Sequence, residues 1–179
     1  GGSGGADYYL VPDYAFRDLN LKYSGSGKKS NYYISLYGGK DHFNYSFDEE
    51  TMQKTISLGY HEQNVQLGGA VFYGWRWNEK NTTNIIASFS SLQNDRDYRE
   101  ETERTAGNQV FRNIHENTTN NMNEFHARGE NKLVVSEKHK TDIGGGLNYW
   151  LTENKLNTIR DTADAGLALP YLYLQDNFA

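Results

Sequence analysis

Apolar and polar side chains alternate along much of this chain with a period of two, which is the pattern that a half-buried β-strand produces. In the first such segment one parity is apolar and the other is polar, with Leu19, Leu21 and Tyr23 set against Asp18, Asn20 and Lys22. Similar segments recur along the chain. We therefore predict strands at 14–23, 31–45, 65–78, 82–97, 122–135, 140–156 and 167–178.

The connections between these segments alternate between short and long. The short ones are 24–29, 79–81 and 136–139, and the long polar ones are 47–64, 98–121 and 157–166. Tight turns at one end of a sheet and long loops at the other are typical of outer-membrane β-barrels. We interpret 98–121 as a mobile loop. Weak alternation at Ile56 and Leu58 indicates that 47–64 is a loop or carries a hairpin extension of its own.

The predicted strands are longer than the ~5–6 residues typical of soluble domains and reach the ~9–11 residues of a tilted membrane strand. Their number is odd, whereas bacterial single-chain barrels usually have an even number of strands from about 8 upward. Lipid does not tolerate open sheet edges. We therefore predict an all-β fold: an antiparallel up-and-down transmembrane β-barrel section, about seven strands of a larger barrel.

Composition narrows the function classes. The 179 residues contain no cysteine, which excludes disulfides and thiolate metal sites. Their formal net charge of -5 argues against nucleic acid as a partner. No apolar run approaches the ~18 residues of a membrane helix. Fourteen tyrosines and three tryptophans suit membrane interfaces. They equally suit the aromatic cross-strand pairs of a soluble β-sandwich.

Four motifs occur in an order and spacing that resemble the barrel strands of one family. They are PDYAFRDLNLK at 12–22, YYISLYGGKDHF at 32–43, GWRWN at 74–78 and LPYLYLQD at 169–176. The chain resembles TonB-dependent outer-membrane receptors, particularly those of Bacteroidota, over most of 8–178. Each motif is loose alone, and the four together in this order are moderately specific.

This resemblance implies a transporter in the bacterial outer membrane that imports a scarce nutrient, such as a glycan, peptide, siderophore or corrinoid. The family's barrel has about 22 strands around a plug. The implied partners are outer-membrane lipid, the rest of the barrel, the plug, the TonB complex acting through the plug, and a surface lipoprotein. Nothing in the sequence matches a plug or a TonB box. Residues 1–5 look like an engineered flexible linker, and 6–179 are expected to be part of the barrel domain.

Polar-parity side chains of the predicted strands are the first candidates for a site. In a plugged barrel they would face the lumen, where they would line the substrate path, bond to the plug, or simply form a solvated wall. These lumen-facing candidates are Asp18, Asn20, Lys22, Arg76, Asn78, His126, Arg128, Glu130 and Lys132.

Substrate selection is expected in the long loops, since aromatic side chains there can stack on sugars or other rings. The loop ligand-contact candidates are Tyr45, Phe47 and Tyr98. Aromatic residues of a membrane-interface belt would give the same signal.

Catalytic and metal-binding patterns are missing from the sequence. The acidic runs 48–50 and 95–97 lack the spacing of a calcium loop, and the histidines lack paired ligand spacing. Residues 144–146, Gly-Gly-Gly, lack the βαβ setting of a nucleotide loop. We expect no enzyme activity, metal or cofactor. A soluble or surface-attached β-domain that binds a glycan or a protein stays open as the alternative function, and an outer-membrane enzyme barrel is a weaker third reading.

Overall fold

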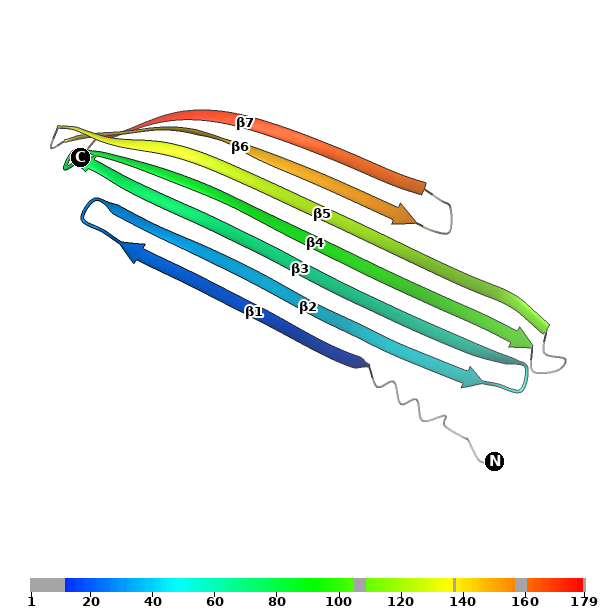
Figure 1. Cartoon of the computed structure of the whole chain (residues 1–179). Helices are drawn as coiled ribbons and strands as arrows, with labels where there is room; N and C mark the ends of the chain where they lie inside the picture. Colours follow the sequence, from blue (N-terminus) through cyan, green and yellow to red (C-terminus); the bar gives the residue numbers. More distant parts are fainter. Residues whose placement is uncertain (1–11, 105–108, 137, 157–160, 179) are drawn as a thin grey trace.

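The structure, a computed structural model, describes residues 12–104, 109–136, 138–156 and 161–178. The expected linker at 1–5 lies outside the described residues. Seven strands fill most of the described chain (Figure 1). They are β1 (Asp13–Ser26), β2 (Ser30–Glu50), β3 (Lys54–Asn78), β4 (Asn81–Arg104), β5 (Gln109–Ser136), β6 (His139–Leu156) and β7 (Asp161–Phe178).

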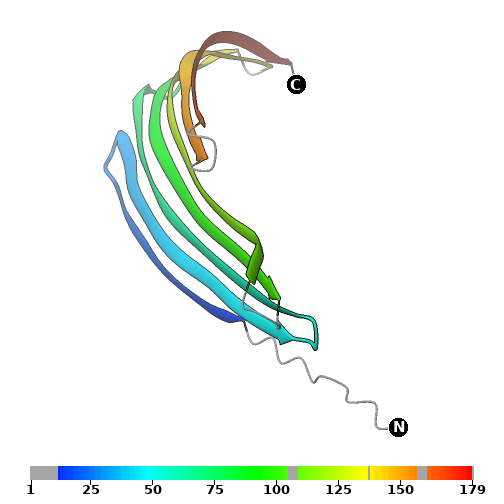
Figure 2. The same ribbon diagram turned by 90° about the vertical axis from the view of Figure 1, so that its right-hand side faces the viewer.

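The strands form one sheet in the order β1-β2-β3-β4-β5-β6-β7, and every neighbouring pair is antiparallel. This confirms the predicted all-β, up-and-down arrangement of seven strands. The described residues contain no helix, and so no helix long and apolar enough to cross a membrane. Figure 2 shows that the sheet is a single layer that curves along and across its strands.

Strand register sorts the side chains into two faces, because directly paired residues of antiparallel strands point to the same side. Asp18 of β1 pairs with Gly39, Gly39 with Gln66, and Gln66 with Leu92. Continuing this pairing places the even-numbered residues of β1, β3, β4, β5 and β6 together with the odd-numbered residues of β2 and β7. We call this side the polar face and the opposite side the apolar face.

The apolar face is open to its surroundings. Ile34, Val71, Ile85 and Leu147 lie on it, with 43–53% of their surface exposed. Within the described residues no hydrophobic side chain is buried in a core. A soluble sheet covers such a face with a second layer because exposed apolar surface costs free energy. This sheet therefore depends on its surroundings to cover the apolar face.

The apolar face changes character along the strands. On β3 it is largely apolar from Trp77 to Val65 and turns polar at Gln63 and His61. We call the part next to the short turns the apolar band. Beyond it, β2 to β5 continue as a projecting wall, which comprises 41–50, 54–64, 94–104 and 109–120.

The projecting wall corrects the predicted loops. Residues 47–64 and 98–121 are mostly strand, and the hairpin extension considered for 47–64 is confirmed: β2 ends at Glu50 and β3 begins at Lys54. The period-two signal continues in part of the projecting wall, where Phe43, Tyr45 and Phe47 alternate with polar residues on the opposite face, but charged runs such as 48–50 and 99–101 interrupt it. The third predicted loop, 157–166, overlaps β7 from Asp161 onward, and 157–160 lie outside the described residues.

Candidate functional site

The lumen-facing candidates of β1 and β5 share one face. Asp18, Asn20 and Lys22 of β1 belong to the polar face by register, and so do the candidates His126, Arg128, Glu130 and Lys132 of β5. Lys22 Nζ lies 5.1 Å from the centroid of the Tyr33 ring, a cation–π distance. That these residues line a transport path stays a prediction.

The two candidates at the end of β3 contact the turns. Arg76 Nη2 donates a hydrogen bond to the carbonyl oxygen of Lys28, with a distance of 3.0 Å. Asn78 Oδ1 accepts one from the backbone N–H of Lys80, at 2.8 Å. Both side chains therefore form hydrogen bonds with the backbone of the short connections at the edge of the apolar band.

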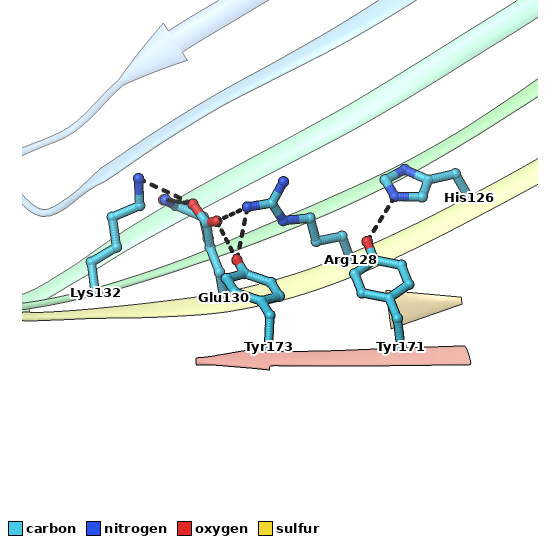
Figure 3. A network of polar contacts seen from close by, with 7 residues as sticks. His126, Arg128, Glu130, Lys132, Tyr171 and Tyr173 are labelled. Carbon is cyan, nitrogen blue, oxygen red and sulfur yellow. Dashed lines mark hydrogen bonds and ion pairs between the residues drawn. The ribbon is translucent and has the colours of Figure 1, made fainter. Parts of the chain in front are cut away.

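Glu130 is the centre of a polar network on the polar face (Figure 3). Its carboxylate accepts hydrogen bonds from Asn84 Nδ2 at 2.9 Å and from the Tyr173 hydroxyl at 2.8 Å. Lys132 Nζ lies 3.3 Å away, and Arg128 forms an ion pair with the same carboxylate. Only 11% of the Glu130 side chain is exposed. A carboxylate this shielded needs such partners, because an unpaired buried charge is costly.

Two glycines of β6 make this network possible. Tyr173 and Tyr171 of β7 reach across β6 to β5, where the Tyr171 hydroxyl lies 3.2 Å from His126 Nε2. A Cβ at Gly144 would stand 2.6 Å from the end of the Tyr173 ring, and one at Gly146 would stand 2.7 Å from the Tyr171 hydroxyl. Figure 3 shows both tyrosine side chains rising from β7 toward the other strands.

Three tyrosines of the projecting wall form a second cluster on the polar face, which we call the tyrosine row. Tyr45 of β2 pairs with Tyr60 of β3, and Tyr60 pairs with Tyr98 of β4. The rings of Tyr45 and Tyr60 have centroids 5.2 Å apart and planes inclined by 20°. Phe43 adds an edge-on contact to Tyr60 with a centroid distance of 6.0 Å.

The tyrosine row corrects one expectation and adds a residue that the sequence reasoning missed. The candidates Tyr45, Phe47 and Tyr98 belong to strands and not to loops. They share a face, since Phe47 follows Tyr45 two positions along β2. Tyr60, the central member of the row, was not a candidate, because its neighbours become visible only from the register.

Hydrogen bonds fix the ionisation of the tyrosine row. The Tyr60 hydroxyl donates to Glu62 at 2.5 Å, and the Tyr98 hydroxyl donates to Glu100 at 2.9 Å. Desolvation, followed by the hydrogen bond to Glu62, raises the pKa of Tyr60 to about 12. The same bond, with further ones from Asn94 and Asn64, lowers the pKa of Glu62. At neutral pH Tyr60 is therefore neutral and Glu62 is ionised.

A row of hydrogen-bonded side chains, which we call the amide ladder, crosses the strands at the base of the projecting wall, next to the Glu62 carboxylate. Asn64 Nδ2 donates to Asp41 Oδ1 at 2.8 Å, Asn94 Nδ2 to Asn64 Oδ1 at 2.7 Å, and Asn120 Nδ2 to Asn94 Oδ1 at 3.3 Å. These four residues pair directly across β2, β3, β4 and β5. Asn94 Nδ2 also lies 2.8 Å from Glu62 Oε1, which joins the ladder to the tyrosine row.

Two acidic side chains of the projecting wall, Asp97 and Glu100, form ion pairs with cationic side chains. Asp97 accepts hydrogen bonds from Arg99 at 2.9 Å and lies 3.1 Å from His115, and these contacts lower its pKa. Over the described ranges no three His, Asp or Glu side chains converge on a common point where a metal ion would bind.

Comparison with known proteins gives a structural likeness only. No protein-family model and no curated protein matches the sequence. Among solved structures, the crystal structure of the unliganded ferric citrate transporter FecA is similar, with a TM-score of 0.65 and 8% sequence identity. The match covers 97% of this chain and 26% of that chain, so this chain spans about a quarter of its length. The sheet is therefore similar in fold to part of a TonB-dependent transporter barrel.

Proposed function

We propose that this chain is the outer-membrane part of a TonB-dependent transporter, a barrel section that recognises and imports a scarce nutrient. The observation that carries this proposal is the single curved layer with an exposed apolar band on one face and a polar face opposite to it. That distribution suits a strand with lipid on one side and a water-filled or plugged lumen on the other. The likeness to FecA supports it.

The apolar band has the height of a bilayer. On β3 it runs from Val65 to Trp77, and a rise of ~3.3 Å per residue makes this about 40 Å along the strand. A strand tilted by ~45° then crosses about 28 Å, close to the ~30 Å of a bilayer's hydrocarbon core. The projecting wall would stand beyond the lipid headgroups.

Aromatic side chains mark the turn-side edge of the apolar band. Tyr73, Trp75 and Trp77 follow one another on the apolar face of β3, with ring centroids 6.4 Å and 6.2 Å apart. Tyr23 and Tyr32 extend this edge across β1 and β2, with centroids 6.0 Å apart. Such belts occupy the interface between headgroups and hydrocarbon. The short turns beside them would be periplasmic and the projecting wall extracellular.

The proposed role is passage and recognition without a chemical step. In the described sheet, β1 and β7 have a neighbour on one side only, and we propose that further barrel strands pair with them. A plug and the TonB complex are the partners that this class of transporter implies. A surface lipoprotein and the nutrient itself stay predictions.

The dependence of the fold on a membrane tests this proposal. The full chain, purified in zwitterionic detergent, should keep its β-sheet circular dichroism signal in micelles and float with phospholipid vesicles. Transfer to plain buffer should cause aggregation. A monodisperse protein with a full β signal in plain buffer would contradict the membrane assignment and favour the soluble binding domain.

A matched pair of variants sharpens the test. Val71 lies on the apolar face in the middle of the apolar band, and its neighbour Ala70 lies on the polar face. Arginine on the lipid side near the bilayer centre costs ~2–4 kcal/mol. V71R should therefore lose most vesicle insertion, while A70R should insert like the unmodified chain. Equal insertion of the two variants would show that the two faces are not distinguished by lipid.

A further inference from the structure

A pocket of about 290 Å³ lies between the β1–β2 turn, the end of β3 and the start of β4 (Figure 1). We call it the turn pocket. Its lining includes three cationic and three hydroxyl side chains, which are Lys28, Lys29, Arg76, Ser26, Ser30 and Thr82. One water molecule occupies ~30 Å³ in the liquid, so the turn pocket has room for a small anion together with hydrating water.

Hydrogen bonds hold the cationic residues of the turn pocket in place. The turn closes through a bond from the backbone N–H of Gly27 to the carbonyl oxygen of Ser30, at 2.7 Å. Arg76 donates from its backbone N–H to the carbonyl oxygen of Lys29 at 2.7 Å, and from Nη2 to that of Lys28 at 3.0 Å. The guanidinium has further N–H groups that can donate to a ligand. The turn and β3 are therefore fixed to each other before a ligand binds.

Acidic side chains around the turn pocket do not neutralise it. None lines the pocket, and within the described part of the chain its three cations form no ion pair. On β5, Lys132 pairs in register with Thr82, and its Nζ lies 3.3 Å from Glu130. Asp142 pairs with Lys132 from β6, and Glu79 lines a different pocket. Because like charges repel, the turn pocket gains from an anion that binds between its cations.

The donors of the turn pocket suit a phosphate group better than a carboxylate. Ammonium and guanidinium groups only donate hydrogen bonds, and each hydroxyl can donate one. A carboxylate offers two oxygens in one plane, whereas a phosphate group offers more oxygens, arranged tetrahedrally. Arginine binds phosphate through paired hydrogen bonds, and lysine binds it as a point charge. The combination of one arginine, two lysines and three hydroxyls therefore indicates phosphate chemistry.

We propose that the turn pocket binds a phosphate group. Arg76 donates paired hydrogen bonds to the phosphate oxygens, Lys28 and Lys29 balance its charge, and the hydroxyls complete the shell of donors. Two sources supply this group, free inorganic phosphate and the headgroup of an anionic phospholipid. Trp75, at the aromatic edge of the apolar band, directly precedes Arg76, so headgroups of the proposed membrane lie at this level. The site goes beyond the proposed function, which assigns no ligand to the short turns.

The test uses the full chain in micelles of a phosphate-free detergent, lauryldimethylamine oxide, at constant chloride. Broadening of the phosphorus NMR signal measures binding of inorganic phosphate, with acetate as the competing carboxylate. Native mass spectrometry compares retention of phosphatidylglycerol with that of phosphatidylcholine. Saturable phosphate binding that survives about tenfold more acetate identifies a free anion as the ligand, and preferential retention of phosphatidylglycerol identifies a headgroup. The absence of both results would overturn the proposal.

Variants locate the binding. K28Q/K29Q should weaken the observed interaction about tenfold or more, a loss of ~1.4 kcal/mol of binding free energy. R76K should weaken it about threefold or more, because lysine lacks the paired donors of arginine. K80Q/K138Q is the matched control, since it removes as many charges from the two neighbouring short turns, outside the turn pocket. Equal losses in both double variants, with unchanged circular dichroism, would refute the proposed site.

The outcome separates the turn pocket from the membrane assignment. Flotation of K28Q/K29Q with phosphatidylcholine vesicles should equal that of the unmodified chain, because both lysines lie outside the apolar band. If flotation is normal and neither inorganic phosphate nor phosphatidylglycerol binds, only the phosphate site is wrong. If the chain needs no detergent and still binds inorganic phosphate at the turn pocket, the proposed transporter is wrong and the site stands.

Discussion

Tyr173 of β7 donates a hydrogen bond to Glu130 of β5, 2.8 Å away, over the backbone of Gly144 in the strand between them. The bond links second-neighbour strands, which lie ~10 Å apart at the usual strand spacing. Arg128 Nη2 lies 2.7 Å from the same hydroxyl. The two bonds connect β7 to β5 through side chains that pass over β6, in addition to the backbone ladder, and the missing side chain at position 144 is their precondition.

Substitution of the β6 glycines should therefore destabilise the sheet in a definite order. G144A would displace the end of the Tyr173 ring and lose its hydrogen bonds, at a cost of about 1–3 kcal/mol. G146A should destabilise the sheet more than G144A, because its Cβ would also meet the backbone carbonyl of Ala127. G129A is the matched control, since no atom lies within 4 Å of its Cβ position. Denaturant unfolding in micelles measures the order, and equal midpoints for all three variants would contradict it.

The tryptophans should report the two faces separately. Trp75 and Trp77 lie on the apolar face at the aromatic edge, whereas Trp150 belongs to the polar face through its pairing with Glu124. In W150F the remaining fluorescence should be quenched by lipids brominated near the headgroup. In the double variant W75F/W77F it should be quenched by aqueous acrylamide instead. The same quenching pattern in both variants would rule out the assigned faces.

Acid should weaken the projecting wall through Glu62. Its hydrogen bonds lower its pKa below the ordinary 4.5, so its contribution to stability is complete above that value and is lost as pH falls through the lower folded pKa. Because Glu62 is partly exposed, we expect its ionised carboxylate to contribute about 1 kcal/mol to the free energy of unfolding. This is less than the ~1.5–3 kcal/mol of a buried hydrogen bond to a charged group.

The variant E62Q isolates this effect. Hydrogen exchange of the projecting wall should be faster in E62Q than in the unmodified chain at neutral pH, and the difference should shrink as the pH falls below 4.5 and through the lower folded pKa of Glu62. A difference that does not change with pH would show that ionised Glu62 contributes nothing.

Alkali should ionise Tyr60 later than an ordinary tyrosine. Its pKa of about 12, against the usual 10.0, means that its contribution to stability is present below pH 10 and is lost as pH rises toward 12. Phenolate absorbance of the unmodified chain minus that of Y60F should titrate with a midpoint of about 12. A midpoint close to 10.0 would mean that the hydroxyl of Tyr60 is solvated and lacks the Glu62 bond.

Sequence alternation predicted the strands of the apolar band well, for a physical reason. Leu19, Leu21 and Tyr23 lie on the apolar face while Asp18 and Asn20 lie on the polar face, so the period of two is visible in the sequence itself. The polar-parity candidates of β1 and β5 consequently fell on one face.

The projecting wall could not be found in the same way. Around Tyr45 and Tyr60 the alternation is interrupted by charged runs, and the two residues lie in segments interpreted as a strand and a loop. Their contact is a property of the register, which the hairpin turn between β2 and β3 sets and which alternation alone does not give. The use of Gly144 likewise depends on which side chain of β7 lies over it.

Reactivity of single cysteines along β3 tests the central claim most directly, since these 179 residues contain no cysteine of their own. The variants L67C, V71C, A70C and H61C would be inserted in phospholipid vesicles and treated with a water-soluble maleimide. We predict that L67C and V71C are protected, while A70C on the polar face and H61C on the projecting wall react. Labelling of V71C at the rate of A70C would contradict the assignment of one face of this sheet to lipid.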